Sequence, residues 1–203
     1  LLSRRQRQMC IRDRDIYREF FTGAKGVNRP NIDYTCYEEG LFVGYRFFDK
    51  YKVSVSYPFG FGLSYTQFKY SKPKSVLSEK GFIFSCTVTN CGNVAGKEVV
   101  QLYITAPGKT MIKPEKELKA FAKTRLLAPG ESQEVCLSII LSDLASYDEQ
   151  KSAWIVEAGT YTALWGNSSQ DMRLNSKFRI KQEQIMEQTY NVLLPVRDLK
   201  ELD

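Results

Sequence analysis

The sequence predicts an all-β protein built as a two-layer antiparallel sandwich. From residue 80 onward it divides into short runs in which apolar and polar residues alternate, and this period of two is typical of half-buried strands. Turn signals containing Gly, Pro or Asn separate the runs at intervals of about eight to twelve residues, as expected of a sandwich. A chain of 203 residues with 43% hydrophobic content is long enough to bury such a core.

Seven strands are expected, at residues 82–88, 100–104, 118–126, 135–139, 154–156, 161–165 and 172–180. In the first strand, Phe84 and its even-numbered neighbours share the core face, and Thr87 lies on the other. In the third, Phe121 is out of step with Leu118, which predicts a β-bulge. In the fourth, Val135 and its odd-numbered neighbours are expected to face the core.

The connections between the strands contain recognisable turn chemistry. The stretch "NCGN" at 90–93 and the dipeptide Pro129-Gly130 are both typical of tight turns. Trp154 and Val156 are expected to begin a hairpin that returns through the turn "EAGT" into the next strand. Seven strands in about a hundred residues is the size of an immunoglobulin-like or fibronectin type III-like sandwich.

The formal charge of +6 is concentrated at the N-terminus. Residues 1–14, "LLSRRQRQMCIRDR", hold five arginines against one aspartate, and leaving them out lowers the net charge from +6 to +2. The stretch has no apolar period and resembles a translated sequencing-adapter remnant, so we interpret it as a non-native leader. Basic and acidic residues alternate along the remaining chain, which disfavours a nucleic acid as partner.

The apolar residues and the cysteines limit the remaining classes. No run approaches eighteen apolar residues, so no segment is predicted to span a membrane. The chain has five cysteines, Cys10, Cys36, Cys86, Cys91 and Cys136, without a metal-binding spacing. Cys86 and Cys136 are expected to be buried free thiols, which favours a reducing compartment such as the cytoplasm without fixing the localisation. Because the chain has no histidine, no zinc site is predicted, and we expect no other cofactor.

Acidic side chains offer few candidates for a metal site. Asp143 is expected to be the N-cap of a short helical turn. A shared metal-binding role for Asp143, Asp148 and Glu149 is the weaker interpretation.

Candidates for catalysis are equally few. The lack of histidine excludes serine–histidine and cysteine–histidine nucleophile systems within the chain. Hydrolysis of a glycoside needs two facing carboxylates, but Glu38 and Glu39 are adjacent in an extended segment and point to opposite faces. We expect Glu39 to pair with Arg46 or with backbone amides, and a substrate-facing role for its carboxylate is the weaker interpretation.

The aromatic residues and glycines also have structural and functional interpretations. Trp154 and Trp165 lie in alternating strands and are expected in the core, whereas sugar stacking on an exposed face is the alternative. The stretch "GFGL" at 60–63 lacks the lysine and the helix of a phosphate-binding loop. Its glycines are expected to let the backbone approach another surface closely.

Five blocks occur in order along the chain: "YEEGLFVGYRFFDK" at 37–50, "YPFGFGLSYTQFKYS" at 57–71, "VTNCGNVAGKEVVQLYITAPG" at 88–108, "KPEKELKAFAKTRLLAPGESQEV" at 113–135 and "DLASYDEQKSAWIVEAGTYTALWGNSS" at 143–169. Together they resemble the C-terminal region of glycoside hydrolase family 3, the β-glucosidase and β-xylosidase family. The resemblance extends over about residues 31–170.

The resemblance implies a domain organisation. It divides the chain after the leader into a remnant of an α/β sandwich domain with its exit segment, an interdomain joint, the fibronectin type III-like domain and a C-terminal linker, at 15–56, 57–80, 81–181 and 182–203. In that family the nucleophilic aspartate and the acid/base glutamate lie in other domains, so no catalytic residue is assigned here. The tail resembles the linker of members in which the barrel domain follows.

The resemblance also implies a function. The chain would be part of a retaining, β-glucosidase-type enzyme that hydrolyses terminal non-reducing β-D-glycosyl residues, and it would be inactive alone. Its partners would be the catalytic domains of the same chain, and the parent's substrate would be a β-glycoside or oligosaccharide. The alternative is a carbohydrate-binding or adhesion module without hydrolase activity, which would present Trp154, Tyr161 or Trp165 on one flat face.

The aromatic residues of the interdomain joint lead to a prediction about their exposure. Its rings supply more apolar surface than a connector can bury by itself. We therefore expect partial exposure of five rings, those of Tyr57, Phe59, Phe61, Tyr65 and Phe68.

Overall fold

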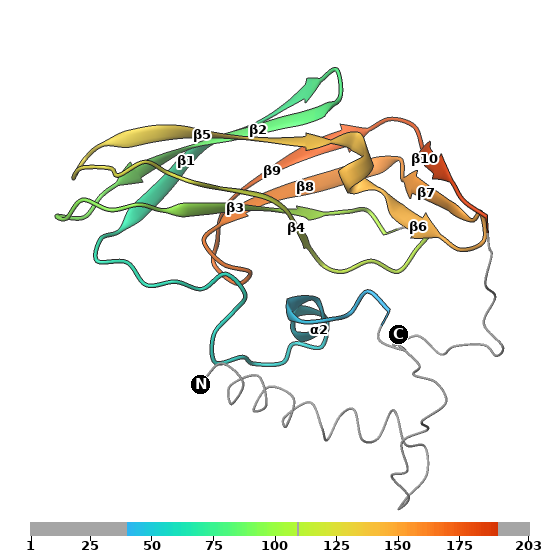
Figure 1. Cartoon of the computed structure of the whole chain (residues 1–203), viewed down its shortest axis with the longest axis horizontal. Coiled ribbons are helices and arrows are strands. Elements are labelled where there is room, and N and C mark those ends of the chain that lie inside the picture. Colours follow the sequence, from blue (N-terminus) through green and yellow to red (C-terminus); the bar gives the residue numbers. More distant parts are fainter. Residues whose placement is uncertain (1–39, 109, 191–203) are drawn as a thin grey trace, which may run out of the picture. The chain divides into compact units, whose positions relative to one another are not determined.

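The computed structural model describes residues 40–108 and 110–190, and antiparallel strands dominate them (Figure 1). The strands are β1 (Phe68–Ser78), β2 (Gly81–Asn90), β3 (Val99–Thr105), β4 (Glu117–Lys123), β5 (Ser132–Ile140), β6 (Ser146–Asp148), β7 (Ala153–Val156), β8 (Gly159–Gly166), β9 (Met172–Ile180) and β10 (Gln184–Gln188). Two short helices, α2 (Tyr45–Lys50) and the 3-10 helix η1 (Leu141–Leu144), accompany them. No helix in this part of the chain combines the length and apolar character needed to cross a bilayer.

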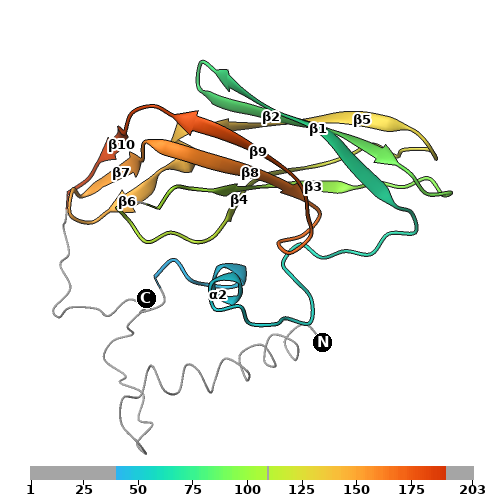
Figure 2. The ribbon, with the colours of Figure 1, turned by 180° about the vertical axis from the view of Figure 1, so that it is seen from behind.

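Two sheets form the predicted sandwich, with the strand orders β1-β2-β5 and β4-β3-β8-β9 (Figures 1 and 2). Their inner faces share one core, in which Phe84 lies 6.2 Å from Trp165 and Phe82 lies 4.6 Å from Phe178 between ring centroids. The expected count of seven strands is confirmed for this sandwich. Its membership differs, because the sandwich contains β1 in place of the expected strand at 154–156.

The segment 154–156 belongs to a third, smaller sheet of order β10-β7-β6. The expected hairpin between this segment and the strand at 161–165 is therefore wrong. Strand β7 pairs with β6 and β10, whereas β8 pairs with β3 and β9. The short connection through Glu157 moves the chain from one sheet to another.

Two predicted domain boundaries differ from the strand limits. Strand β1 pairs with β2 along its length, so the sandwich begins at Phe68 rather than at residue 81. The sequence pattern did not reveal this strand, because β1 is irregular in its middle. Lys72 has a φ of +52°, and the register shifts between Ser71 and Lys74. The proline between these two residues is tolerated because β1 is an edge strand. Strand β10 likewise lies within the expected linker 182–203.

The predicted bulge in the third run is confirmed. Leu102 pairs with Ala120 and Tyr103 pairs with Leu118, which leaves Lys119 as the extra residue of β4. The bulge turns Ala120 toward the core and leaves Phe121 69% exposed.

The turn at 90–93 contains a buried asparagine that the sequence did not single out. The side chain of Asn90 is fully buried and donates to the carbonyls of Val94 (2.8 Å) and Leu127 (2.9 Å), while its oxygen accepts from Thr66 Oγ1 (2.6 Å). These bonds tie the chain before β1 to the turns at one end of the sandwich. The predicted Pro129-Gly130 turn is confirmed, with Gly130 at a φ of +79°.

The two cysteines expected in the core differ from each other. Cys86 is buried, and this burial raises the pKa of its thiol to about 12. Cys136 is exposed, so the expectation of burial is wrong for it. It alternates with Val135 and Leu137, which face inward, and therefore points to solvent. Cys10 and Cys36 lie outside the described residues.

Candidate functional site

The segment from residue 40 to residue 67 packs on the outer face of β3 and β4. Tyr45 of α2 stacks on Phe59 with ring centroids 5.0 Å apart and meets the edge of Tyr103 at 5.9 Å. Its hydroxyl accepts the backbone N–H of Leu118 at 2.9 Å. Tyr103 is fully buried although it alternates with the core residues of β3, so both faces of this strand are covered.

Backbone contacts fix the second half of the segment. Gln101 Nε2 donates to the carbonyl of Gly60 (3.2 Å), and the N–H of Ser169 donates to the carbonyl of Phe59 (2.8 Å). Gly60 has a φ of +80°, and a Cβ atom there would lie 2.4 Å from Gln101 Nε2. The predicted close approach is confirmed at Gly60. At Gly62 a Cβ would meet no atom within 4 Å.

Ion pairs join α2 to the start of β4. Arg46 lies 3.0 Å from Glu117, and Lys116 lies 2.8 Å from the buried Asp49. Arg46 therefore has a carboxylate partner other than the expected Glu39, which lies outside the described residues together with Glu38. The segment is thus held to the sandwich by stacking, backbone hydrogen bonds and ion pairs.

The same segment also exposes apolar side chains, which together we call the joint surface. Its members and their exposed fractions are Leu41 46%, Val43 61%, Tyr51 37%, Tyr57 67%, Phe59 50%, Phe61 47%, Leu63 93% and Tyr65 99%. The expected exposure is confirmed for the four rings at 57, 59, 61 and 65. It is wrong for Phe68, which begins β1 and is 9% exposed in the core.

The sequence did not predict the residues of β3 on which this segment packs. Gln101 and Tyr103 are buried on the outer face of β3, where alternation predicted solvent. The signal that could have found them is the run "VVQLYIT", because a strand covered on both faces lacks clean alternation.

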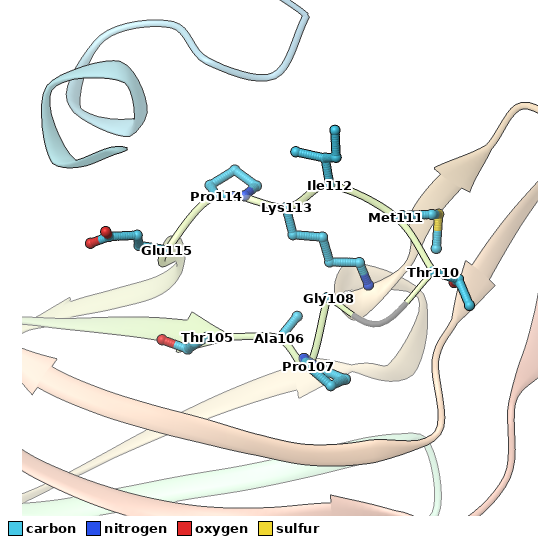
Figure 3. A pocket seen from close by; sticks show the side chains of 10 residues that line it. All are labelled: Thr105, Ala106, Pro107, Gly108, Thr110, Met111, Ile112, Lys113, Pro114 and Glu115. Carbon is cyan, nitrogen blue, oxygen red and sulfur yellow. The ribbon is translucent and has the colours of Figure 1, made fainter. Parts of the chain in front are cut away.

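A pocket of about 410 Å³ lies in the loop between β3 and β4 (Figure 3). Among its lining residues, Lys113 is buried and lies 2.5 Å from Glu157, and Glu115 pairs with Lys52. Burial alone would raise the pKa of Glu157, but its bonds to Lys113 and Thr110 outweigh this and hold the pKa below the ordinary value. The lining offers a single carboxylate, whereas a glycosidase needs two.

A second pocket of about 550 Å³ lies beside the joint surface and is lined by Leu63, Lys97, Glu98, Lys123 and Arg173, among others. Glu98 is 7% exposed and accepts hydrogen bonds from the hydroxyl of Tyr70 (2.9 Å) and from Arg173 (3.4 Å). This lining also holds one carboxylate.

The other candidate residues are dispersed. Trp165 and Tyr161 are fully buried, as the core interpretation predicted, whereas Trp154 is 42% exposed and the same prediction is wrong for it. Tyr161 donates its hydroxyl to the carbonyl of Glu157 at 2.9 Å. Of the three rings that a carbohydrate-binding module would present, only Trp154 is therefore exposed.

The acidic candidates have structural partners. Asp143 is the third residue of η1 rather than its N-cap, and its carboxylate accepts the N–H of Ile140 at 3.1 Å. Asp148 accepts the N–H of Lys151 at 3.1 Å. Within residues 40–108 and 110–190, no group of three potential metal ligands is present.

Comparison with known proteins agrees with this architecture. Residues 98–169 match the fibronectin type III-like domain family. Beta-glucosidase A of Butyrivibrio fibrisolvens is 42% identical over 87% of this chain and 24% of its own length, and the beta-glucosidase of Ruminococcus albus is 38% identical over 86% of this chain and 19% of its own. The solved structure of beta-glucosidase 3B from Thermotoga neapolitana with α-D-glucose superimposes with a TM-score of 0.74 and 43% identity, covering 80% of this chain and 22% of that one.

The matched part of each relative is small. The chain spans about a fifth to a quarter of the length of these relatives. Nevertheless, the sandwich topology, the domain match and the identity over most of the chain agree. The chain therefore carries a fibronectin type III-like domain and is similar over most of its length to β-glucosidases of glycoside hydrolase family 3, consistent with a part of such an enzyme.

Proposed function

We propose that this chain is a non-catalytic part of a β-glucosidase-type enzyme and that its joint surface docks on the catalytic part. The observation that carries the proposal is the exposure of apolar side chains in a segment that is otherwise well held. Residues 40–67 are fastened to β3 and β4 by Tyr45, Arg46 and Gly60, yet they still expose the joint surface. Eight exposed apolar side chains within 25 residues are more than scattered surface hydrophobics explain, and exposed apolar surface that gathers in one region marks an interaction site.

The partner of the joint surface is inferred from the part of each relative that this chain does not match. About three quarters or more of each matched β-glucosidase lies outside the part that corresponds to this chain. The joint surface precedes β1 directly, as expected of a segment between two domains. The covering surface would then belong to the same polypeptide.

In the parent enzyme we propose retaining hydrolysis of a terminal β-D-glycosidic bond. This reaction uses one carboxylate as nucleophile and a second as acid and then base, ~5–5.5 Å apart. Both would come from the catalytic part. The domain order of the parent, with the barrel domain after this chain, stays a prediction from the tail.

The test is to recover the gene on both sides of this segment and to assay the complete protein on an aryl β-glucoside. We expect hydrolysis in which proton NMR detects the β-anomer of glucose first, while the 203-residue chain shows no turnover. The flanking sequence should encode a Ser-Asp-Trp-like motif and a glutamate for acid/base catalysis. A complete reading frame without them, or an inactive complete protein, would overturn the proposal.

A further inference from the structure

The small sheet β6-β7-β10 presents one row of side chains to solvent. Trp154 of β7 pairs directly with Tyr147 of β6 and with Glu187 of β10, so the three side chains project from the same face. Trp154 is 42% exposed and Glu187 is also exposed. The alternating residues of β7, Ala153 and Ile155, are fully buried, which identifies the row as the outer face.

Neighbouring bonds hold this row in place. Tyr147 and Trp154 make an edge contact, with ring centroids 5.6 Å apart and planes at 61°. The hydroxyl of Tyr147 lies 3.1 Å from Thr189 Oγ1, and the N–H of Thr189 donates to the carbonyl of Ser152 at 2.8 Å. Gln188 Nε2 donates to that same carbonyl at 3.0 Å. The aromatic pair and the end of β10 are therefore held in place, which lowers the cost of ordering the rings on binding.

The chemistry of the row differs from that of the joint surface. It combines the exposed side chain of Trp154 with the carboxylate of Glu187, whereas the joint surface has no charged member. Ile185, an exposed apolar residue of β10, pairs with Ile155 and so projects from the other face. A protein interface would favour a contiguous apolar patch with few charges at its centre.

A pyranose ring complements such a row. The π-face of an indole is electronegative and attracts weakly positive C–H groups, and a carboxylate accepts hydrogen bonds from hydroxyls. In β-glucopyranose every ring substituent is equatorial, so both ring faces present only C–H groups and the hydroxyls project from the rim. A galactose unit carries an axial hydroxyl that interrupts one face.

We propose that the outer face of β6-β7-β10 binds a glucopyranose unit of a β-linked oligosaccharide, with the ring on Trp154 and a hydroxyl donating to Glu187. The site is a binding subsite without catalytic chemistry, because the row contains a single carboxylate. It does not depend on the proposed function, since binding can be measured on the 203-residue chain without turnover.

Tryptophan fluorescence provides the test. The chain has two tryptophans, and Trp165 is fully buried, so the exposed Trp154 should report the ligand. Titration with cellotetraose up to about 10 mM would saturate a site with a Kd of about 1 mM and should therefore give a saturable change in emission. Cellotetraose should bind at least about threefold more tightly than a β-galactosyl oligosaccharide of equal length.

Variants and a second readout complete the test. By isothermal titration calorimetry, Trp154→Ala should lose at least about tenfold in affinity and Glu187→Gln about threefold, whereas Glu183→Gln, an exposed carboxylate outside the row, should bind as the wild type does. Unchanged Trp165 emission would show that Trp154→Ala is folded. Absence of binding, or full binding by Trp154→Ala, would overturn the proposal. So would protection of Trp154 from acrylamide in the complete protein, because the face would then be a protein interface.

Discussion

At the residue scale, Glu98 is a buried carboxylate whose surroundings disfavour its charge. Burial raises its pKa above the ordinary glutamate value, and the charge of Asp171 adds to this, while the bond from Tyr70 and the charge of Arg173 oppose it. The folded state therefore holds the proton more tightly than the unfolded chain does. The stability that Glu98 contributes is fully present below the unfolded pKa and is lost as the pH rises through the raised folded pKa.

The first prediction uses Glu98→Gln, which mimics the protonated side chain. Relative to the wild type, this variant should gain free energy of unfolding as the pH rises from about 4 to about 7, because it has no proton to lose. Urea titrations across this range measure the difference. Glu149→Gln, at an exposed position, serves as the control and should follow the wild type. A difference in the free energy of unfolding between Glu98→Gln and the wild type that stays constant with pH would contradict the raised pKa of Glu98.

The second prediction compares two glycines of the same loop. Gly60→Ala forces a side chain into a positive φ and against Gln101, which should cost about 1–2 kcal/mol. Gly62→Ala meets no neighbour within 4 Å and should change stability by less than about 0.5 kcal/mol. Thermal unfolding measures both, and hydrogen exchange at Leu118, whose N–H is bonded to Tyr45, reports loosening of the segment. Equal behaviour of the two variants would show that the approach to Gln101 is unimportant.

At the element scale, a buried ion pair anchors the loop between β3 and β4. Lys113 and Glu157 are 4% and 3% exposed, and Glu157 also accepts the N–H (3.0 Å) and hydroxyl (2.5 Å) of Thr110. Glu157 is the residue through which the chain crosses from β7 to β8. The pair therefore fixes a long loop at the place where the chain changes sheets.

The third prediction follows from this burial. Lys113→Met leaves the Glu157 carboxylate without its counter-charge and should destabilise the chain by about 3–5 kcal/mol. Adding Glu157→Gln should recover part of this loss, because no buried charge then remains. As a control, Lys151→Met breaks an exposed pair with Glu183 and should cost less than about 1 kcal/mol. Additive effects in the urea double-mutant cycle would mean that the two side chains do not interact.

The strands were predictable where one face is buried and the other is solvated. Strand β5 follows strict alternation, which correctly places Val135 inward and should also have placed Cys136 outward. Alternation does not predict the buried residues of a strand that is covered on both faces, as at Tyr103 of β3. It also fails where a proline and a register shift interrupt the strand, as in β1. Pairing between distant segments was not available from local pattern either, so Trp154 was placed in a hairpin with β8 rather than in the small sheet.

The sequence predicted that the segment around Tyr57 is an exposed joint, but it did not predict the contacts that hold this segment to the sandwich. The density of rings and glycines around Tyr57 indicated a joint, and four of its five named rings are exposed. The seat of that joint on Gln101 and the ion pair between Arg46 and Glu117 depend on tertiary contacts between segments far apart in sequence. No local period encodes such contacts, because each partner by itself is compatible with solvent.

At the scale of the whole molecule, the joint surface is more apolar than the isolated chain requires. Leu63 and Tyr65 are 93% and 99% exposed and contribute almost nothing to burial here. If the catalytic part covers them, these two side chains stabilise the docked protein rather than the fold of the sandwich. The fourth prediction separates these two roles by comparing the isolated chain with the complete protein.

The double variant Leu63→Ser with Tyr65→Ser should change the stability of the isolated chain by less than about 0.5 kcal/mol and should raise its solubility. In the complete protein it should cost about 3–6 kcal/mol, because burying each of the two side chains contributes about 1.5–3 kcal/mol. Calorimetric unfolding of both proteins measures the contrast. Ile83→Ser, at an exposed position of β2 on the other sheet, is the matched control and should have a small effect in both. If the double variant costs as little in the complete protein as in the isolated chain, the joint surface does not dock, since only a covered side chain can lose burial.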